Sequence, residues 1–358
     1  MLINTFYIFL DSIADFDAVM FHIRDMKEEN EPVIELPKTR SPNQRYVMFL
    51  MESPSYDLFP YEKFQNYFNW TMTYKRNSDF FRPYGWIAPN NWKWHYPAST
   101  LPNLDFSQYP IMSSESKNVS LSNKTKKPVA WLVSNCRTHS QREHYVENLS
   151  KHIQVDVYGH CHNNSRCPEK ADNKCSEYIQ SNYMFYLSFE NSVCDEYVTE
   201  KFWSYLQGEL VPIVLGGADY DKIAPPHSFI NAMDYPDPKD LAKHLNYLIS
   251  NQTAYNEYLW WKPYYTVFKD TPENVARAMC QMCEVLNDPN PKKTPSIYEN
   301  IQDWWIGQGN CQENLPWSKP VYKYDWFVLD DWKDFVHDST GKGFHYFFDT
   351  LRKANVIV

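Results

Sequence analysis

Buried strands alternate with helices over residues 128–250, and this alternation constrains the fold more than any other feature of the chain. Short, continuous apolar runs are typical of strands that are covered on both faces. The expected strands are residues 128–135, 155–158, 183–189 and 211–215, and the expected helices begin near residues 140, 199 and 238. This order predicts a parallel sheet with right-handed crossovers, and therefore an α/β fold.

A different unit precedes this alternation. Residues 18–22 and 46–51 are apolar runs and predict two more buried strands. Residues 117–127 are polar and lack aromatic side chains, which is typical of an exposed linker between domains. The expected units are therefore a first domain, 1–125, a second domain, 126–290, and an aromatic C-terminal extension, 291–358, which has no clear period and which the sequence does not place.

The composition excludes several classes of protein. There are 35 Lys and Arg residues against 44 Asp and Glu residues, a net charge of −9, whereas proteins that bind nucleic acid carry a basic face. Glycine is scarce, and the chain has neither the G-x-G-x-x-G pattern of dinucleotide-binding folds nor a P-loop. Aromatic residues make up 17% of the chain, which fits either stacking on sugar rings or an aromatic-rich core.

Cysteines and glycosylation sequons together favour an oxidising lumen. The 8 cysteines are Cys136, Cys161, Cys167, Cys175, Cys194, Cys280, Cys283 and Cys311, and the Asn-x-Ser/Thr sequons are at Asn69, Asn118, Asn123, Asn148, Asn163 and Asn251. Cys280 and Cys283 also have the spacing of half a zinc site, but the other cysteines are spaced too widely to supply the second half. The apolar run at residues 2–10 is too short for a transmembrane helix and lacks the basic flank of a signal peptide.

The first candidate site lies at the end of strand 128–135. Ser140 and Glu143 have the spacing of a capping box, so we expect Ser140 to cap a helix. Arg142 then lies in the first turn of that helix, where the backbone attracts anions. An Arg side chain at this point is suited to bind phosphate, and a solvated surface Arg is the alternative.

The second candidate site is the segment 189–202, between the end of a strand and the start of the next helix. Lys201 lies in the first turn of that helix, where a cation is unfavourable, and a bound phosphate would remove the conflict. Glu200 is suited to accept hydrogen bonds from sugar hydroxyls, Tyr197 to contact a ring, and Asn191 lies beside them. The alternative is a polar loop that ends in an ordinary helix cap.

Glu52 directly follows the second expected strand of the first domain and is the candidate general base. The carboxyl end of a parallel strand faces the ligand in folds of this kind, so the carboxylate can accept a proton there. The alternative is a strand-end cap or a salt bridge. The two Asp-x-Asp pairs, at 15–17 and 219–221, have the spacing of metal–nucleotide sites, but neither follows a strand as such sites do, so we predict no metal site.

Several of these segments resemble one family. YMFYLSFENSVCDEYVTEKFW (183–203) strongly resembles the signature of the α-1,3-fucosyltransferases, glycosyltransferase family 10. Three further stretches fit the same family: MESPSYDL (51–58), FNWTMTYKRNSDFFRPYG (68–85) and VPIVLGGADYDKIAPPHSFI (211–230). RAMCQMCEVL (277–286) resembles its C-terminal cysteine pair. The resemblance covers residues 11–290 in order.

The resemblance implies a GT-B fold of two Rossmann-like domains with the active site in the cleft between them. It implies transfer of L-fucose from GDP-fucose to O3 of N-acetylglucosamine on glycoprotein glycans, with inversion at the anomeric carbon. Glu52 then matches the general base of the family. The donor-binding positions are Arg142, Asn191, Tyr197, Glu200 and Lys201, and the acceptor-region positions are Asn69, Trp70, Tyr74 and Arg76.

The resemblance also bears on covalent modification. It pairs Cys280 with Cys283, and we expect a disulfide between them. A glycan on Asn69 would crowd the cleft, so we expect this residue to be unmodified. The remaining sequons, Asn118, Asn123, Asn148, Asn163 and Asn251, are the candidates for glycosylation.

No resident cofactor is implied, because GDP-fucose is a substrate and protein cations can neutralise the leaving diphosphate. Stimulation by Mn or Mg stays open, without an identifiable metal site.

The expected location is the Golgi lumen, in a type II membrane protein whose partners are GDP-fucose and glycans that contain N-acetylglucosamine. Family members carry an upstream apolar strand, a stem and a membrane anchor. We find none in this chain, so we expect the first domain to lack its first strand and membrane association to need an anchor outside this chain.

Two other functions stay open. A catalytically inactive homologue that binds glycans would keep the fold and the aromatic residues, and donor turnover would distinguish it. A glycoside hydrolase would use a carboxylate pair, Glu52 with Glu190 or Glu200, but would leave Arg142 and Lys201 without a role. The sequence does not decide between core, Lewis-type and LacdiNAc-type acceptors.

Overall fold

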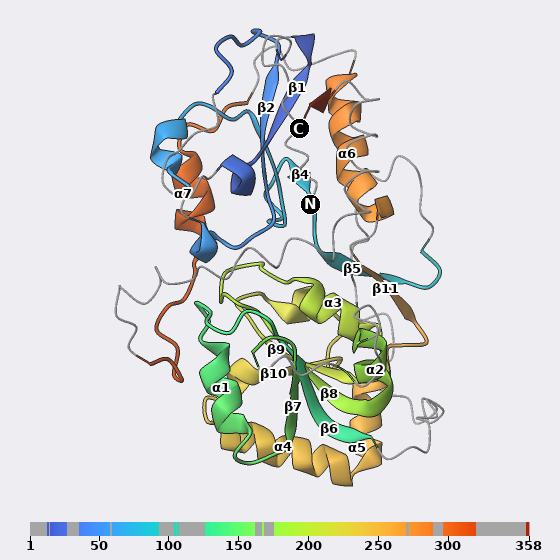
Figure 1. The fold of residues 1–358 in the computed structure, drawn as a ribbon. Coiled ribbons are helices and arrows are strands. Elements are labelled where there is room, and N and C mark those ends of the chain that lie inside the picture. The colour runs from blue at the N-terminus through green and yellow to red at the C-terminus, as the bar shows by residue number, and fades with distance from the viewer. Residues whose placement is uncertain are drawn as a thin grey trace.

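The computed structural model describes residues 13, 15–26, 36–57, 59–92, 104, 106, 126–161, 167, 175–269, 272–288, 296–319 and 356–357. Over these residues the chain forms two parallel sheets, each flanked by helices, and a two-stranded ribbon that lies between them (Figure 1). The prediction of an α/β fold with two Rossmann-like units, the GT-B type, is confirmed.

The first sheet has the strand order β12-β1-β2-β3-β4, and all of its strands are parallel. Its strands are β12 (Val356–Ile357), β1 (Ala18–His22), β2 (Arg45–Leu50), β3 (Trp70–Thr73) and β4 (Phe80–Phe81). The predicted strands at 18–22 and 46–51 are β1 and β2. Part of the extension that the sequence could not place supplies β12, which pairs with β1.

Helices from the C-terminal part of the chain cover both faces of this first sheet (Figure 1). Because side chains alternate along a strand, neighbouring residues of β1 face opposite sides. Met20 packs in one cluster with Met282 of α6 (Pro272–Leu286), and Phe21 belongs to another with Trp305 of α7 (Ile301–Trp305). The predicted second domain, 126–290, includes α6, but this helix lies against the first sheet.

The second sheet has the order β10-β9-β8-β6-β7 and is also parallel. Its strands are β6 (Lys127–Leu132), β7 (Val155–Tyr158), β8 (Tyr183–Phe189), β9 (Val211–Leu215) and β10 (Ile230–Asn231). All residues of β8 and β9 are buried, as their continuous apolar runs predicted. The crossovers bring the carboxyl ends of β6, β8 and β9 to one edge of the sheet.

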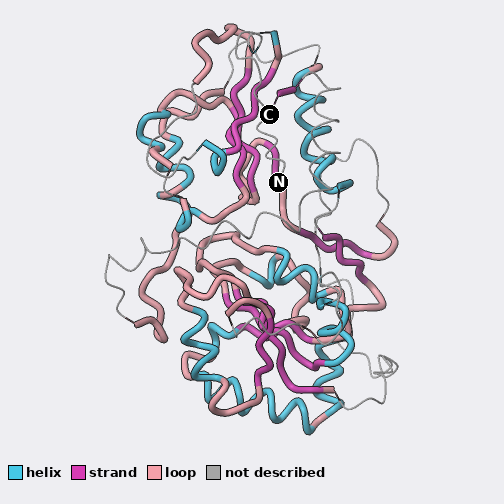
Figure 2. Tube along the Cα trace, in the orientation of Figure 1, coloured by secondary structure: helices cyan, strands magenta, loops and turns pink. Residues whose placement is uncertain are grey.

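Helices surround the second sheet (Figures 1 and 2). They are α1 (Arg142–Leu149), α2 (Cys175–Asn182), α3 (Glu200–Leu206), α4 (Pro238–Ser250) and α5 (Gln252–Asn256). Thr199 caps α3 by accepting a hydrogen bond from the Lys201 backbone N–H, and Asp237 caps α4 in the same way. Short 3₁₀ helices occur at Ile23–Met26, Pro54–Tyr56, Tyr61–Phe64, Tyr220–Lys222, Ala232–Asp234, Glu257–Leu259 and Gly307–Gly309.

The predicted capping box at Ser140 is wrong. α1 begins at Arg142 after Gln141, which has a left-handed backbone (φ 47°). The Glu143 carboxylate accepts hydrogen bonds from the backbone N–H and the hydroxyl of Thr138 instead. The Ser140 hydroxyl donates to the Glu190 carbonyl at 2.7 Å, because the turn before α1 is packed against the end of β8. This contact links the two candidate donor segments.

β5 (Gly85–Pro89) and β11 (Tyr265–Lys269) form the antiparallel ribbon between the two sheets. Gly85 lies directly against α3. A Cβ atom at this position would come within 2.7 Å of Cδ2 of Trp203, a ring that is only 4% exposed. The absence of a side chain at Gly85 therefore allows the ribbon to approach the second sheet.

Gly85→Ala is expected to destabilise the protein by about 1–3 kcal/mol, because a buried Trp ring must shift to make room. Urea unfolding checks this. Gly208→Ala is the matched control, since a Cβ there meets the flexible side chain of Gln180 and should cost less. A Gly85→Ala protein as stable as the wild type would show that Trp203 does not restrain the ribbon.

Three disulfides join Cys136 to Cys161, Cys167 to Cys175 and Cys194 to Cys311. The predicted bond between Cys280 and Cys283 is wrong for this structure, in which neither residue forms a disulfide. Both residues lie within the continuous helix α6. Residues three apart on a helix have Cβ atoms about 5–6 Å apart, whereas a disulfide needs about 3.5–4.5 Å. The bond would therefore require α6 to be distorted.

Of the glycosylation candidates, Asn148 and Asn251 are both partly exposed. Asn118, Asn123 and Asn163 lie outside the described residues. Among the described residues, no helix is both long and apolar enough to cross a bilayer.

Asn69 is expected to carry no glycan, because its side chain is 2% exposed and is used inside the protein. Its Oδ1 accepts from the Tyr46 backbone N–H at 2.9 Å, and its Nδ2 donates to the Ser296 carbonyl at 3.0 Å. Peptide mass spectrometry of material from a secretory host should find Asn69 unmodified, with Asn251 as the accessible comparison. A glycan on Asn69 would mean that this packing is not formed.

Candidate active site

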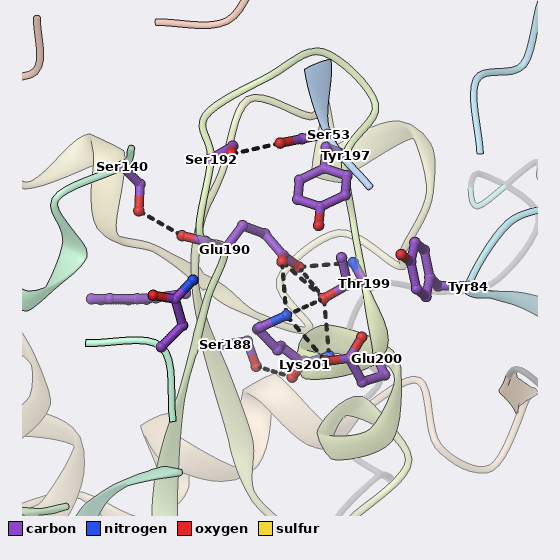
Figure 3. Close-up of polar contacts among 12 residues, drawn as sticks. Ser53, Tyr84, Ser140, Ser188, Glu190, Ser192, Tyr197, Thr199, Glu200 and Lys201 are labelled. Carbon is purple, nitrogen blue, oxygen red and sulfur yellow. Dashed lines mark hydrogen bonds and ion pairs between the residues drawn. The ribbon is translucent and has the colours of Figure 1, made fainter. Parts of the chain in front are cut away.

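The loop that joins β8 to α3 contains a buried carboxylate (Figure 3). Glu190 is fully buried and accepts hydrogen bonds from the Thr199 backbone N–H at 2.8 Å and from its hydroxyl at 2.8 and 3.1 Å. Burial raises the pKa of Glu190, and the nearby Lys201 ammonium acts in the opposite direction. Glu190 therefore closes residues 190–199 into a rigid loop, which we call the donor loop.

Lys201 is paired with protein carboxylates, so no bound phosphate is needed to remove the conflict predicted for a cation in the first turn. Its Nζ donates to Thr199 Oγ1 at 2.9 Å and to Glu200 Oε1 at 3.0 Å, and lies 3.6 Å from Glu190 Oε2 (Figure 3). Burial opposes its charge, but Glu200 and Glu190 outweigh burial, and the pKa of Lys201 is raised. These carboxylates offset the unfavourable position of a cation in the first turn.

Arg142 lies beneath the donor loop and is 3% exposed, which excludes a solvated surface Arg. Its guanidinium donates to the Phe189 carbonyl and, at 3.4 Å, to the Asn135 carbonyl. Within the described structure, its Nε and the Oδ1 of Asn191 are buried without a hydrogen-bond partner. A ligand at this edge of the sheet would meet these two polar atoms only after neighbouring groups move aside.

Glu52, from the first domain, meets the donor loop of the second. Its Oε2 accepts from the Tyr197 hydroxyl at 3.4 Å, and its Oε1 accepts from Arg24 NH1 at 2.9 Å. The Glu52 side chain is 32% exposed, so it can reach a ligand. Burial, and then the Glu52 carboxylate, raise the pKa of Tyr197 well above its usual value, so this phenol stays a hydrogen-bond donor.

A second contact between the domains lies beside this one. Ser53 Oγ donates to Ser192 Oγ at 2.6 Å (Figure 3), and Ser55 Oγ lies 3.3 Å from Cys194 Sγ. The loop after β2 and the donor loop are thus joined at several points. The structure brings together Glu52 and the predicted donor-binding segment, as the sequence interpretation required.

The four acceptor-region residues separate into two pairs. Asn69 and Trp70 are buried in the first domain, and Trp70 belongs to the cluster that packs on α6, so neither faces the cleft. Tyr74 and Arg76 line a pocket of about 200 Å³ between the domains. The wall across from them, formed by the second domain, includes Glu196, Val198, Trp203, Asp219 and Lys222.

Sequence reasoning gave no role to Arg24, Tyr84 or Glu196. The Tyr84 hydroxyl donates to the Met51 carbonyl at 2.6 Å, directly beside Glu52, and Glu196 Oε2 accepts from the Arg76 backbone N–H at 2.7 Å. Arg24 could have been found, because β1 and β2 are parallel neighbours and the residues after their carboxyl ends meet. No comparable signal marks Tyr84 or Glu196.

Among the residues that the structure describes, no three His, Cys, Asp or Glu side chains are grouped so that they could hold a metal ion. Asp219, of the second Asp-x-Asp pair, lies 2.7 Å from the Lys222 ammonium and forms an exposed ion pair. We accordingly assign no metal ligand within the described site.

Two family models match this chain. Residues 9–85 match the N-terminal fucosyltransferase model, and residues 121–304, more than half of the chain, match the C-terminal model of glycosyltransferase family 10 (fucosyltransferase). The chain belongs to glycosyltransferase family 10. Glu52 lies in the first match and the donor loop lies in the second, so the contact between Glu52 and Tyr197 joins the two matched parts of the chain.

Curated relatives agree with this assignment. The α-(1,3)-fucosyltransferase C of Drosophila melanogaster is 34% identical over 307 residues, which is 86% of this chain and 69% of that protein. The 3-galactosyl-N-acetylglucosaminide 4-α-L-fucosyltransferase of Bos taurus is 38% identical over 286 residues, 78% of this chain and 69% of that protein. This family member is a fucosyltransferase, an enzyme that transfers fucose from GDP-fucose.

Solved α1,3-fucosyltransferases are more distant from this family member. One with GDP-fucose is 19% identical, covers 69% of this chain and 76% of its own, and has a TM-score of 0.44. Another with GDP is 16% identical. The match covers 76% of this chain and 78% of the solved chain, with a TM-score of 0.46. The assignment to the family does not depend on these structures, because it rests on the sequence matches.

Proposed function

We propose that this fucosyltransferase transfers L-fucose to O3 of N-acetylglucosamine on glycoprotein glycans, with inversion at the anomeric carbon. The observation that carries the proposal is the hydrogen bond between Glu52 and Tyr197, which places a first-domain carboxylate against the donor loop. The names of relatives support the linkage and the acceptor class. They include the glycoprotein 3-α-L-fucosyltransferase A of Drosophila melanogaster, which is 36% identical over 247 residues.

An inverting transfer needs one base and no covalent nucleophile. The acceptor O3 attacks C1 of fucose from the face opposite GDP, and the bond from C1 to the phosphate oxygen breaks with its electron pair on GDP. Glu52 accepts the proton from O3, because its carboxylate is partly exposed and lies against the donor loop. Arg24 and Tyr197 hold the two carboxylate oxygens and thereby fix the orientation of the base.

The leaving diphosphate gains negative charge as this bond breaks. Lys201 and the Nε of Arg142 are the cationic groups of the donor site, and each can donate to phosphate oxygens. Glu200, which is exposed, can take a hydroxyl of the donor, and the unpaired but buried Oδ1 of Asn191 can take another once the site opens around it. In a site from which the acceptor excludes water, such donors stabilise the transition state more than they do in solvent.

The acceptor sugar is proposed to occupy the pocket that Tyr74 and Arg76 line. The Tyr74 side chain is 3% exposed, and its hydroxyl has no hydrogen-bond partner in the described part of the chain. If the pocket wall moves so that a sugar reaches this hydroxyl, the hydroxyl can donate to it without breaking an existing bond. Carboxylates and aromatic rings that face each other across a pocket suit sugar hydroxyls and ring C–H groups.

We further infer that the transfer needs no resident cofactor or divalent metal and takes place in the Golgi lumen. The cations of the donor site support the first point. The three disulfides support an oxidising compartment for the second. Mn or Mg would then act on GDP-fucose in solution and not through a protein site.

The hydrolase alternative is not favoured by the geometry of its second carboxylate. Glu190 is fully buried and is bonded to Thr199, so it cannot protonate a glycosidic oxygen. Glu200 is engaged by Lys201. The remaining alternative, an inactive glycan-binding homologue, predicts binding without turnover.

The experiment is incubation with GDP-fucose and a panel of defined N-glycans, with EDTA or with Mn²⁺, followed by mapping of the product linkage. The proposal expects fucose on O3 of N-acetylglucosamine under both conditions. Free fucose as the only product would indicate a hydrolase, and a different linkage or a strict need for Mn²⁺ would contradict the mechanism above. Glycan binding without any product would identify the inactive homologue.

A further inference from the structure

A C-terminal segment, residues 306–319, lies beyond the family match, which ends at residue 304, and yet it reaches the donor site. We call it the C-terminal strap. It leaves α7 on the first domain and runs down to the second, past the donor loop and on to the start of α1 (Figure 1). Its contacts divide into three groups.

The first group fixes the strap to the first domain. Buried Lys75, on the loop after β3, donates to the Trp304 carbonyl at 2.8 Å and to the Gln308 carbonyl at 3.3 Å. Gly309 packs against Pro54, where an added Cβ would come within 2.7 Å of the proline ring. The strap therefore starts from a rigid position beside the loop that contains Glu52.

The second group fixes the donor loop to the strap. Cys311 forms the disulfide with Cys194, which is fully buried. On either side of this bond, the Gln312 backbone N–H donates to the Val193 carbonyl at 2.8 Å, and the Asp195 backbone N–H donates to the Gly309 carbonyl at 2.9 Å. Three consecutive residues of the donor loop are thus bonded to the strap, between Asn191 and Tyr197.

The third group fixes the turn before α1. Trp317 Nε1 donates to the Ser140 carbonyl at 3.0 Å. The Gln141 side-chain amide forms a reciprocal pair with the Lys319 backbone, accepting from its N–H at 2.6 Å and donating to its carbonyl at 3.1 Å. This pair holds the left-handed backbone of Gln141, the residue that immediately precedes Arg142.

The turn before α1 is in turn bonded to the donor loop. The Ser140 backbone N–H donates to the Asn191 carbonyl at 3.0 Å, and its hydroxyl donates to the Glu190 carbonyl at 2.7 Å. The strap therefore touches both segments of the donor site, one at the residue before Arg142 and the other at residues 193–195, between Asn191 and Tyr197. A site whose segments are already ordered loses less entropy when it binds a ligand.

We propose that Cys311 and Trp317 are positioning residues for the donor. They hold the donor loop and the start of α1 in the arrangement that binds the diphosphate of a nucleotide sugar. This inference rests on the proposed function for the identity of the ligand, but the contacts are independent of that function. Displacement of binding groups by about 1 Å can cost on the order of 10²-fold in activity, so loss of either anchor weakens the donor more than the acceptor.

The test uses the full chain and two variants that act on different anchors. Cys194→Ser with Cys311→Ser removes the disulfide, and Trp317→Phe removes the ring N–H and one ring of the indole but keeps an aromatic ring in the core. Cys167→Ser with Cys175→Ser is the matched control, because it removes a disulfide of the same domain that does not touch the strap. GDP affinity is measured by calorimetry, and the KM values for donor and acceptor are measured separately, well below the melting temperature of each protein.

Both strap variants should bind GDP at least 10-fold more weakly and raise the donor KM, while the acceptor KM and the control variant stay near wild type. Unchanged GDP affinity in both strap variants would overturn the proposal, and so would an equal loss in the control variant. If wild-type protein binds GDP but transfers no fucose, the proposed function fails, and calorimetry still decides the role of the strap.

Discussion

Glu52→Gln is expected to reduce fucose transfer by about 10²–10⁴-fold, the usual contribution of a general base, while GDP affinity stays unchanged. The amide matches the size of the carboxylate, and its oxygen can still accept the hydrogen bond from Tyr197. It cannot take up the proton that leaves the acceptor O3. Initial rates at saturating donor and acceptor, together with calorimetry for GDP, check the expectation.

The control for this prediction is Glu62→Gln, an exposed carboxylate in the same domain, which should leave the rate unchanged. Loss of GDP binding in Glu52→Gln would assign Glu52 to the donor site. A rate near wild type would remove it from the mechanism, and Glu200 would become the next candidate for the base.

The sequence was sufficient where one local pattern decides the structure. The continuous apolar run at residues 183–189 can only be buried on both faces, and it forms the central strand β8. Thr199 and Asp237 each precede a helical pattern, and both cap a helix. The contact between Glu52 and the donor loop also followed, because the carboxyl ends of the strands in both sheets face the cleft.

The sequence was insufficient where a distant segment competes with a local pattern. Ser140 and Glu143 fit a capping box, but Ser140 bonds the end of β8, 50 residues further along the chain, and Glu143 bonds Thr138. Trp70 lies in a motif assigned to the acceptor, yet it packs against α6. Neither outcome can be read locally, because each depends on which surface covers the residue.

The C-terminal region was the largest gap in the sequence interpretation. Its aromatic residues have no period, and those that the structure describes pack into the cores of both domains. Trp305 enters the core of the first domain, and Trp317 packs edge-on against Tyr145 of the second. The pairing of Cys311 with Cys194 spans 117 residues, and no spacing rule selects it from the other pairings that eight cysteines allow.

Lys201→Ala is expected to destabilise the ligand-free protein. A first-turn lysine without a partner would give the opposite result, because its removal would relieve an unfavourable charge. Glu190 is fully buried and lies 3.6 Å from the Lys201 ammonium, so the variant leaves a buried carboxylate without its cation. Breaking a buried pair costs about 3–5 kcal/mol, and we expect the lower end because Lys201 is 24% exposed. Lys243→Ala, which breaks an exposed pair with Asp240 on α4, is the control and should change little.

The pH dependence of this cost identifies Glu190 as its source. Burial already raises the pKa of Glu190 against the pull of Lys201, so removal of Lys201 must raise it further. A carboxyl whose folded pKa is raised costs nothing below the unfolded value of about 4.3, and its cost grows as the pH rises from there to the folded pKa and stays constant above it. The stability deficit of Lys201→Ala should therefore be small near pH 4.5 and reach its maximum once the pH exceeds the raised pKa of Glu190. A deficit that does not change with pH would assign the loss to packing.

The same variant tests the donor site, because Lys201 has a second role once a diphosphate is bound. Loss of one group that stabilises developing charge costs about 10²–10³-fold in rate, and we expect this loss in kcat/KM for GDP-fucose. Lys201→Arg keeps the charge beside Glu190 and should restore stability more fully than activity, since the wider guanidinium cannot place its charge at the same point. Thermal melting with and without saturating GDP separates the two roles. If Lys201→Ala keeps the full GDP-induced shift, the diphosphate binds elsewhere and Lys201 serves only to neutralise Glu190.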